Sequence, residues 1–281
     1  MTVYSYSDRE NNQIDATFHK STKQNKDNPL IIYIHGGGLI YGSKDDLPLV
    51  HIEKFTQLGF NILALDYPLI PESSLETLIN SLLDGINWGI SKFTTNDDFI
   101  LFGRSAGAYL SLILSAKFLD IKPKAIISFY GYYSLMDKEL KKPSDFYAQY
   151  PLLDDVMIAP LIQKQPLFNA PIEQRFPIYL SYRQRGIWVS KMLAHVSNIE
   201  NYSLADDDIR TLPPLFIAVS KDDQDVPYTQ SIYLHDLATK SDIYTLNGLP
   251  HDFDRLVDDV QTKKAYHQLM NWLICLQKRR L

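Results

Sequence analysis

The stretch FILFGRSAGAYLSL, residues 99–112, decides the fold. Its first four residues have the length and apolar composition of a buried strand, and the residues from Ala108 onward are typical of a buried helix. Between them stands Gly-x-Ser-x-Gly, with Ser105 at its centre. A strand, this pentapeptide and a helix in that order predict a nucleophile elbow, which exposes a serine hydroxyl above the sheet.

The elbow needs these residue types for a physical reason. The turn is too sharp for side chains at the two glycine positions, and the serine takes a strained backbone conformation. The helix behind Ser105 directs its free N–H groups and the positive end of its dipole at the place where an oxyanion would develop. A glycine-bounded turn without catalytic role is the alternative, and the strand–turn–helix context favours the catalytic interpretation.

Composition narrows the class of protein. With 281 residues and 45% hydrophobic content, the chain can bury one large core, and we expect a single domain over residues 1–281. The net charge of −5 provides no basic field for nucleic acid. The first residues lack a signal-peptide pattern and no apolar run is long enough to span a bilayer, so a cytoplasmic protein is expected. The single cysteine, Cys275, excludes an internal disulfide and is expected in the core.

Apolar runs of strand length alternate with helical stretches. Strands are predicted at 3–6, 13–19, 30–34, 61–66, 99–102, 125–130, 214–219 and 242–246, the first two antiparallel. Helices are predicted at 46–58, 74–91, 108–114 and 254–277, and a polar surface loop at 20–28. This order predicts an α/β fold with a mostly parallel, doubly wound sheet of about eight strands. In such sheets the chemistry lies beyond the carboxyl ends of the strands.

A second motif, His-Gly-Gly-Gly at residues 35–38, follows the strand at 30–34. Three glycines let the backbone approach a substrate closely and turn its N–H groups toward it. A phosphate-binding loop is the alternative, but the Lys-Ser/Thr of a P-loop and the G-x-G-x-x-G spacing are both missing. The amides of Gly37, Gly38 and Ala106 are therefore predicted to form an oxyanion hole. The histidine itself is expected to stiffen the loop by hydrogen bonding.

A serine nucleophile of this kind needs a general base that follows it in the chain. Of the four histidines after Ser105, His267 falls in the helix predicted at 254–277 and His235 in a stretch also expected to be helical, and a solvent-facing role is expected for both. His195 precedes the candidate acids. His251 lies in a loop directly after the last predicted strand, so it is the predicted general base.

His-Gly-Gly-Gly about seventy residues before Gly-x-Ser-x-Gly resembles the α/β-hydrolase fold, specifically the esterase and lipase branch that includes hormone-sensitive-lipase-like enzymes. The resemblance extends from about Leu30 to the end of the chain. LDYPLIPE at residues 65–72 is similar to the Asp-Tyr-Arg-Leu-x-Pro-Glu of relatives, with Pro68 where they often have Arg. At the elbow, Arg104 replaces a frequent acidic residue and Ala108 a frequent glycine.

The resemblance also selects the acid of a Ser-His-Asp triad. Relatives carry an Asp four residues before the Pro of a Val-Pro pair, and this register selects Asp223, with Asp225 as the alternative. Relatives also place their catalytic histidine in a loop similar to the one around His251. The acid would hold the imidazole in the right tautomer and stabilise the imidazolium. Asp222 and Asp225 would add negative potential that raises the pKa of His251.

Residues 132–212 do not continue the alternation, and they are predicted to form a helical cap or lid inserted into the domain. Its main helix is expected at 178–194, and prolines are expected to break the rest into short pieces: Pro143, Pro151, Pro160, Pro166, Pro171 and Pro177. Most cap aromatics should pack onto the sheet, and a few should line an acyl or alcohol pocket. Arg183 and Arg185 are expected on a solvated face rather than on a substrate carboxylate.

These features together predict a serine hydrolase that cleaves short-chain, small-molecule carboxylic esters through an acyl-enzyme. No cofactor or metal is expected, since the sequence contains no metal-ligand cluster. The sequence leaves open a homodimer, a peptidase or amidase of the same fold, and a non-catalytic member that binds a small ligand.

Overall fold

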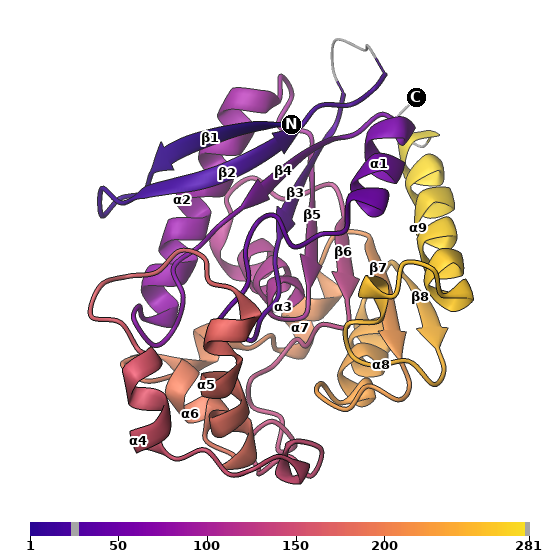
Figure 1. The fold of residues 1–281 in the computed structure, drawn as a ribbon. Helices are drawn as coiled ribbons and strands as arrows, with labels where there is room; N and C mark the ends of the chain where they lie inside the picture. Colours follow the sequence, from indigo (N-terminus) through magenta and orange to yellow (C-terminus); the bar gives the residue numbers. More distant parts are fainter. Residues whose placement is uncertain (24–27, 279–281) are drawn as a thin grey trace.

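The computed structural model describes residues 1–23 and 28–278, so part of the predicted loop at 20–28 lies outside the described residues. An eight-stranded sheet runs through the middle of the molecule in the order β1-β2-β4-β3-β5-β6-β7-β8 (Figure 1). The pairs β1–β2 and β2–β4 are antiparallel, and the other neighbours are parallel. The predicted α/β fold with a mostly parallel sheet is confirmed.

The elements have these bounds. The strands are β1 (Thr2–Ser7), β2 (Gln13–His19), β3 (Leu30–Ile34), β4 (Asn61–Leu65), β5 (Phe99–Arg104), β6 (Ile126–Phe129), β7 (Leu215–Ser220) and β8 (Ser241–Leu246). Helices packed on the sheet are α1 (Leu49–Leu58), α2 (Leu75–Phe93), α3 (Ala106–Ile113), α8 (Tyr228–Leu237) and α9 (Val260–Lys278). Between β6 and β7 lie α4 (Asp155–Ile158), α5 (Ile172–Gln184), α6 (Trp188–Met192) and α7 (Asp206–Arg210).

The central strands are covered on both faces, which is why they are apolar at every position. Successive side chains of a strand point to opposite faces. In β3, Ile32 and Ile34 join the core beneath α2, α3 and α8, whereas Ile31 and Tyr33 join the core beneath α1 and α9. The two helical layers thereby fix the sheet as a rigid support. Within the described residues, no helix is long and apolar enough to cross a membrane.

The expected core position of Cys275 is wrong, because this residue is exposed. The buried residues of α9 recur three and four apart, at Thr262, Ala265, Tyr266, Leu269 and Leu273. Cys275 follows the last of them by two residues, which places it on the opposite side of the helix. The same helix begins at Val260 rather than at the predicted residue 254.

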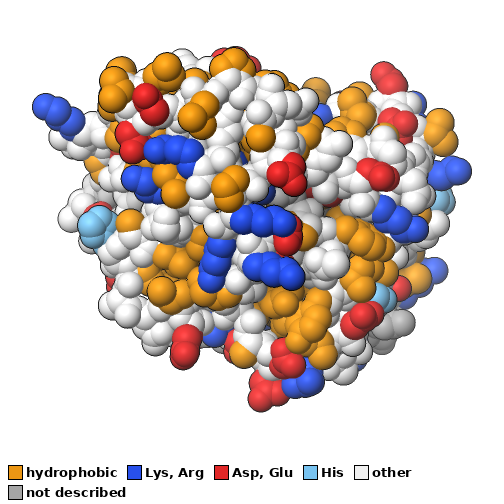
Figure 2. Space-filling view, turned by 90° about the horizontal axis from the view of Figure 1, so that it is seen from below, with side chains coloured by type: hydrophobic (Ala, Val, Ile, Leu, Met, Phe, Trp, Pro, Cys, Tyr) orange, Lys and Arg blue, Asp and Glu red, His pale blue; other side chains and the backbone are white. Residues whose placement is uncertain are grey.

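Helices α4, α5 and α6 lie beyond the carboxyl ends of the strands (Figure 1). The single helix expected at 178–194 is instead two helices, α5 and α6, separated at Gly186, whose φ of 66° suits glycine. The expected break at Pro177 is wrong, since this proline lies inside α5. One lost backbone hydrogen bond is offset there by burial of the helix's side chains. Figure 2 views the molecule from below, where exposed apolar side chains mix with charges of both signs.

The glycines of the elbow stand where no side chain fits. A Cβ added to Gly107 would lie 2.0 Å from the carbonyl oxygen of Ile34, and one added to Gly103 would lie 2.1 Å from that of Gly107. Ser105 between them has φ 52° and ψ −119°. Strand β5 and helix α3 therefore approach as closely as backbone allows, and this contact raises the serine above the sheet edge.

Gly107→Ala should destabilise the fold by about 3 kcal/mol or more, because the new methyl group meets backbone that cannot move aside. Gly248→Ala is the matched control. Gly248 has φ 70°, but nothing lies within 4 Å of an added Cβ, so only backbone strain of about 1 kcal/mol is expected. Denaturant unfolding of both variants measures the difference. Equal losses would contradict the close packing at the elbow.

Candidate active site

Three predicted residues from distant parts of the chain meet at the carboxyl ends of three strands. Ser105 follows β5, Asp223 follows β7 and His251 follows β8. The Oγ of Ser105 lies 2.8 Å from Nε2 of His251, and Nδ1 of the same ring lies 2.6 Å from Oδ2 of Asp223. This is the order of contacts that a hydroxyl nucleophile, a general base and an orienting acid require.

Asp223 is held rigidly. Its side chain is fully buried, and its Oδ1 accepts hydrogen bonds from the backbone N–H groups of Asp225 and Val226, both at 2.9 Å. These two backbone hydrogen bonds orient the carboxylate of Asp223, rather than that of Asp222 or Asp225, toward Nδ1 of His251. Asp222 instead accepts a hydrogen bond from the N–H of Gly248.

The alternative acid, Asp225, lies on the other side of the imidazole. Its Oδ2 is 3.9 Å from Nε2 of His251, and its carboxylate accepts hydrogen bonds from the hydroxyl of Tyr179. Arg183 donates to the main-chain oxygen of Asp225 at 2.8 Å and is only 4% exposed, so the expected solvated position is wrong. Its charge is matched by Asp225. Arg185 is half-buried and pairs with Asp155 at 2.8 Å.

The other histidines are not part of this cluster. His235 is half-buried, with Nδ1 2.7 Å from Oγ of Ser241, so its expected solvent-facing position is only partly correct. His195 and His267 are exposed. His35 is fully buried, its ring stacks on Tyr67, and its Nδ1 lies 2.7 Å from the carbonyl oxygen of Gly36. Burial lowers the pKa of His35, so the neutral ring holds the loop.

The glycine loop runs beside Ser105. Gly37 and Gly38 have φ values of 101° and 58°, which glycine adopts readily. A Cβ on Gly38 would lie 2.4 Å from the ring of Tyr179. Within the described residues, the N–H groups of Gly37 and Gly38 make no protein hydrogen bond, and that of Ala106, first in α3, has no partner in its helix. Gly37 and Gly38 also line the cavity beside Ser105, whereas Ala106 is fully buried and is not part of that lining.

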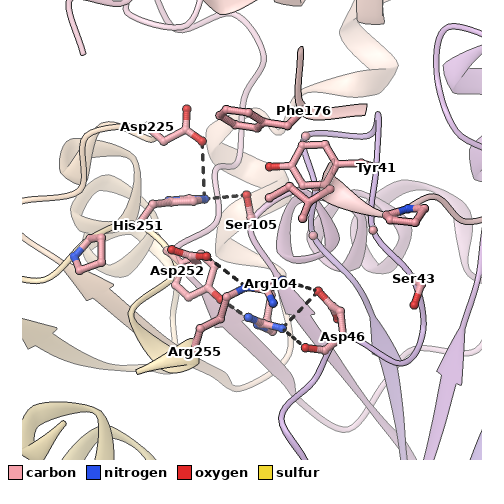
Figure 3. Close-up of a pocket in the computed structure, with 18 of the residues that line it drawn as sticks. Tyr41, Ser43, Asp46, Arg104, Ser105, Phe176, Asp225, His251, Asp252 and Arg255 are labelled. Carbon is pink, nitrogen blue, oxygen red and sulfur yellow. Dashed lines mark hydrogen bonds and ion pairs between the residues drawn. The ribbon is translucent and has the colours of Figure 1, made fainter. Parts of the chain in front are cut away.

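A cavity of about 340 Å³ opens onto Ser105 and His251. Figure 3 shows His251 on one side of Ser105 and Tyr41 on the other, with Phe176 between Asp225 and Tyr41. The aromatic part of its lining is Tyr41, Tyr130, Phe146, Tyr147 and Phe176, of which the last three come from residues 132–212. A cavity of this size and lining suits a small, largely apolar ligand. No metal-binding group of three or more His, Cys, Asp or Glu side chains occurs in the part of the chain that the structure describes.

Arg104, directly before Ser105, is a residue whose role the sequence did not reveal. It is 2% exposed, and it donates to Oδ1 of Asp254 at 2.9 Å and to the hydroxyl of Tyr130 at 2.7 Å. It also contacts the hydroxyl of Tyr33 at 3.1 Å and lies 3.3 Å from the carboxylate of Asp46 (Figure 3). An arginine at the end of an apolar strand predicts that a buried carboxylate neutralises it, but the sequence does not indicate which carboxylate does so.

Asp254 lies three residues after His251 and is fully buried. Besides Arg104, it accepts hydrogen bonds from the hydroxyls of Tyr130 at 2.5 Å and Tyr266 at 3.1 Å. The ion pair between Arg104 and Asp254 therefore connects the turn at Ser105 directly to the loop that carries His251. It also explains why α9 starts late, since residues 253–255 form a short 3-10 turn that places Asp254 in the core.

The electrostatics of His251 favour the charged ring. Burial lowers the pKa of this residue, but the carboxylates of Asp223, Asp225 and Asp252 outweigh burial and raise the pKa to about 9. The expected contribution of Asp225 is present, and Asp252 acts in the place expected of Asp222.

Comparison with known proteins gives the family. A family model described as the alpha/beta hydrolase fold matches residues 31–255, so the chain belongs to the α/β-hydrolase family, in the esterase and lipase branch that its motifs indicate. A Staphylococcus aureus protein of unknown function is 31% identical, with a TM-score of 0.90, covering 98% of this chain and 99% of that chain. An α/β-hydrolase superfamily protein from Enterococcus faecalis is 28% identical, with a TM-score of 0.85, covering 97% of this chain and 98% of that chain.

Curated relatives are more distant and carry mixed names. A kynurenine formamidase from Danio rerio is 24% identical over 72% of this chain and 74% of its own length. Carboxylesterase/phospholipase LipF from Mycobacterium tuberculosis is 30% identical over 35% of this chain and 27% of its length. A non-reducing polyketide synthase from Penicillium rubens matches 44% of this chain, but the match spans 6% of the synthase. These relatives support a hydrolase without fixing the bond that is cleaved.

If His251 is the general base that the sequence predicts, kcat/KM for an ester should rise with pH up to about 9, because only a neutral imidazole can accept the proton of Ser105. Asp225→Asn removes one carboxylate that raises this pKa, so the rising limb should move to lower pH. A pH–rate profile of both proteins at constant ionic strength measures the two limbs. A rising limb near pH 6.5, the ordinary histidine pKa, in the unmodified protein would contradict the statement that nearby carboxylates raise the pKa of His251.

Proposed function

We propose that this protein hydrolyses short-chain carboxylic esters through an acyl-enzyme, with Ser105 as nucleophile, His251 as general base and Asp223 as the orienting acid. The observation that carries the proposal is the pair of contacts on one imidazole, 2.8 Å to Ser105 and 2.6 Å to Asp223. A structural histidine has no need of a buried carboxylate on one nitrogen and a strained, cavity-facing serine on the other.

Each part of the site has a role in the proposed reaction. Ser105 attacks the ester carbonyl carbon while Nε2 of His251 takes the hydroxyl proton. The amides of Gly37, Gly38 and Ala106 stabilise the oxyanion of the tetrahedral intermediate. The C–O bond to the leaving group breaks, and His251 gives its proton to the departing alcohol. Water then repeats the sequence on the acyl-enzyme and releases the carboxylic acid.

The size of the cavity supports a small substrate. About 340 Å³ lined by aromatic rings accommodates a short acyl group and a compact alcohol. We further propose that residues 132–212 act as a cap, since Phe146, Tyr147 and Phe176 from this segment line the cavity. The name carboxylesterase of one relative agrees with ester cleavage, whereas the name formamidase of another raises the question of amides.

Ser105→Ala should lower kcat for p-nitrophenyl acetate by about 10⁶, because the covalent step is lost. The release of p-nitrophenol measures this, and a fluorophosphonate probe should label the unmodified protein and not the variant. Cys275→Ser, a change at an exposed position outside the cavity lining, serves as the control for expression and folding. Tight binding of an ester without turnover or labelling would favour a non-catalytic binding protein instead.

Asp223→Asn should reduce kcat for the same ester by about 10⁴, because the amide cannot hold the productive tautomer of His251 or stabilise its cation. Asp225→Asn is the matched control two residues away, and its loss at the pH optimum should be at most about tenfold. If the two variants exchange these effects, Asp225 rather than Asp223 is the triad acid.

A further inference from the structure

A second carboxylate, that of Asp225, lies near Nε2 of His251, the nitrogen that exchanges protons in the proposed reaction. Oδ2 of Asp225 lies 3.9 Å from Nε2 of His251, the same atom that lies 2.8 Å from Oγ of Ser105. Figure 3 shows Asp225 and Ser105 joined to this one ring nitrogen at the edge of the cavity. Ester hydrolysis as proposed above requires a carboxylate on Nδ1, so Asp225 affects that reaction only by raising the pKa of His251.

Asp225 is held in place by neighbours that leave an acceptor position free. The hydroxyl of Tyr179 donates to both carboxylate oxygens, at 2.7 and 2.8 Å. Burial raises the pKa of Tyr179 well above its ordinary value, so the hydroxyl keeps its proton and acts as donor. Tyr147, in the cavity wall, is a second side-chain hydrogen-bond partner of Asp225. A carboxylate offers about four lone-pair positions and these two hydroxyls supply two protons, so acceptor capacity remains.

Charge balance for Arg183 is the structural alternative. That guanidinium lies 3.5 Å from Oδ1 of Asp225 and donates to its main-chain oxygen, so the carboxylate does neutralise a buried cation. The arginine does not account for the second oxygen, Oδ2, which lies toward Nε2 of His251. Asp225 also lines the cavity, with its side chain 11% exposed.

The leaving group is what lies next to Nε2 during the reaction. Its departing atom must come within about 3 Å of this nitrogen to receive the proton, which brings substituents on that atom within reach of Oδ2. A departing ester oxygen carries no hydrogen. A departing amide nitrogen does, and once its lone pair faces Nε2, its N–H must point elsewhere and costs free energy if it stays unpaired in the pocket.

We propose that Asp225 accepts this N–H bond and that the site hydrolyses secondary amides of small acids as well as esters. The inference rests on the proposed function, because it uses the same nucleophile and base. Ser105 adds to the amide carbonyl, the C–N bond breaks, and the nitrogen takes the proton that His251 received from the serine. Water then cleaves the acyl-enzyme, so that one amide and one water give a carboxylic acid and an amine. The N–H contact forms fully only as the nitrogen becomes tetrahedral, so it lowers the barrier.

The test compares p-nitrophenyl acetate with p-nitroacetanilide, which share the acetyl group and the aromatic ring and differ in O against N–H. The unmodified protein should cleave the anilide above the level of Ser105→Ala. Asp225→Ala should lower the ratio of anilide to ester kcat/KM by about 10- to 100-fold. Any change in the fraction of neutral His251 affects both substrates equally and cancels in this ratio.

Asp252→Asn is the matched control. Asp252 also lines the cavity and raises the pKa of His251, but it pairs with Arg255 at 3.1 Å. This variant should leave the ratio within about threefold, because it removes no acceptor beside the leaving atom. If Asp225→Ala does not fold, Asp225→Asn keeps the side-chain volume and should lower the ratio by less, because a neutral amide oxygen accepts a weaker hydrogen bond than a carboxylate.

The failures are distinguishable. Ester turnover with no anilide turnover, or an anilide-to-ester ratio unchanged in Asp225→Ala, overturns the role of Asp225 and leaves the proposed function standing. A loss of both activities in equal proportion, with a lowered melting temperature, assigns Asp225 to charge balance alone. Absence of ester turnover and of fluorophosphonate labelling in the unmodified protein overturns both proposals.

Discussion

The ion pair between Arg104 and Asp254 is the constraint on which the geometry of the site depends. One partner precedes Ser105 and the other lies three residues beyond His251, so a 2.9 Å contact fixes two loops that are far apart in the sequence. Both side chains are buried, and desolvation makes such a pair weak as a source of stability. The ion pair instead contributes to the geometry of the site, because the hydroxyls of Tyr130 and Tyr266 hold the carboxylate of Asp254 in one orientation.

The carboxylates around His251 divide between its two nitrogens. Asp223 lies on Nδ1, where backbone N–H groups orient it, and Asp225 lies near Nε2, where Tyr179 and Arg183 hold it. This arrangement stabilises an imidazolium more than burial opposes it. In the proposed reaction, the imidazolium of His251 would therefore be stabilised before it forms, and the neutral ring would be favoured as the pH rises toward about 9.

The segment between β6 and β7 supplies the side chains that close the site. Phe146, Tyr147 and Phe176 line the cavity, and the ring of Tyr179 covers Gly38 while its hydroxyl reaches Asp225. One helix, α5, thus contacts the glycine loop and the acidic loop together. Helix α5 consequently supplies part of the cavity wall, at Phe176, and also orients the carboxylate near Nε2 of His251.

The sequence by itself determined the sheet, the elbow and the approach of Ser105 to His251, because local patterns specify strands, turns and helix starts, and parallel strands bring their carboxyl ends to one edge. It misplaced Cys275 and Arg183, since burial depends on which face of a helix meets the core. Only the tertiary structure decided which carboxylate lies on which nitrogen and what neutralises Arg104. Asp222, Asp223 and Asp225 have nearly the same local sequence environment. Their roles differ only because the folded loop places each carboxylate at a different distance from the imidazole of His251.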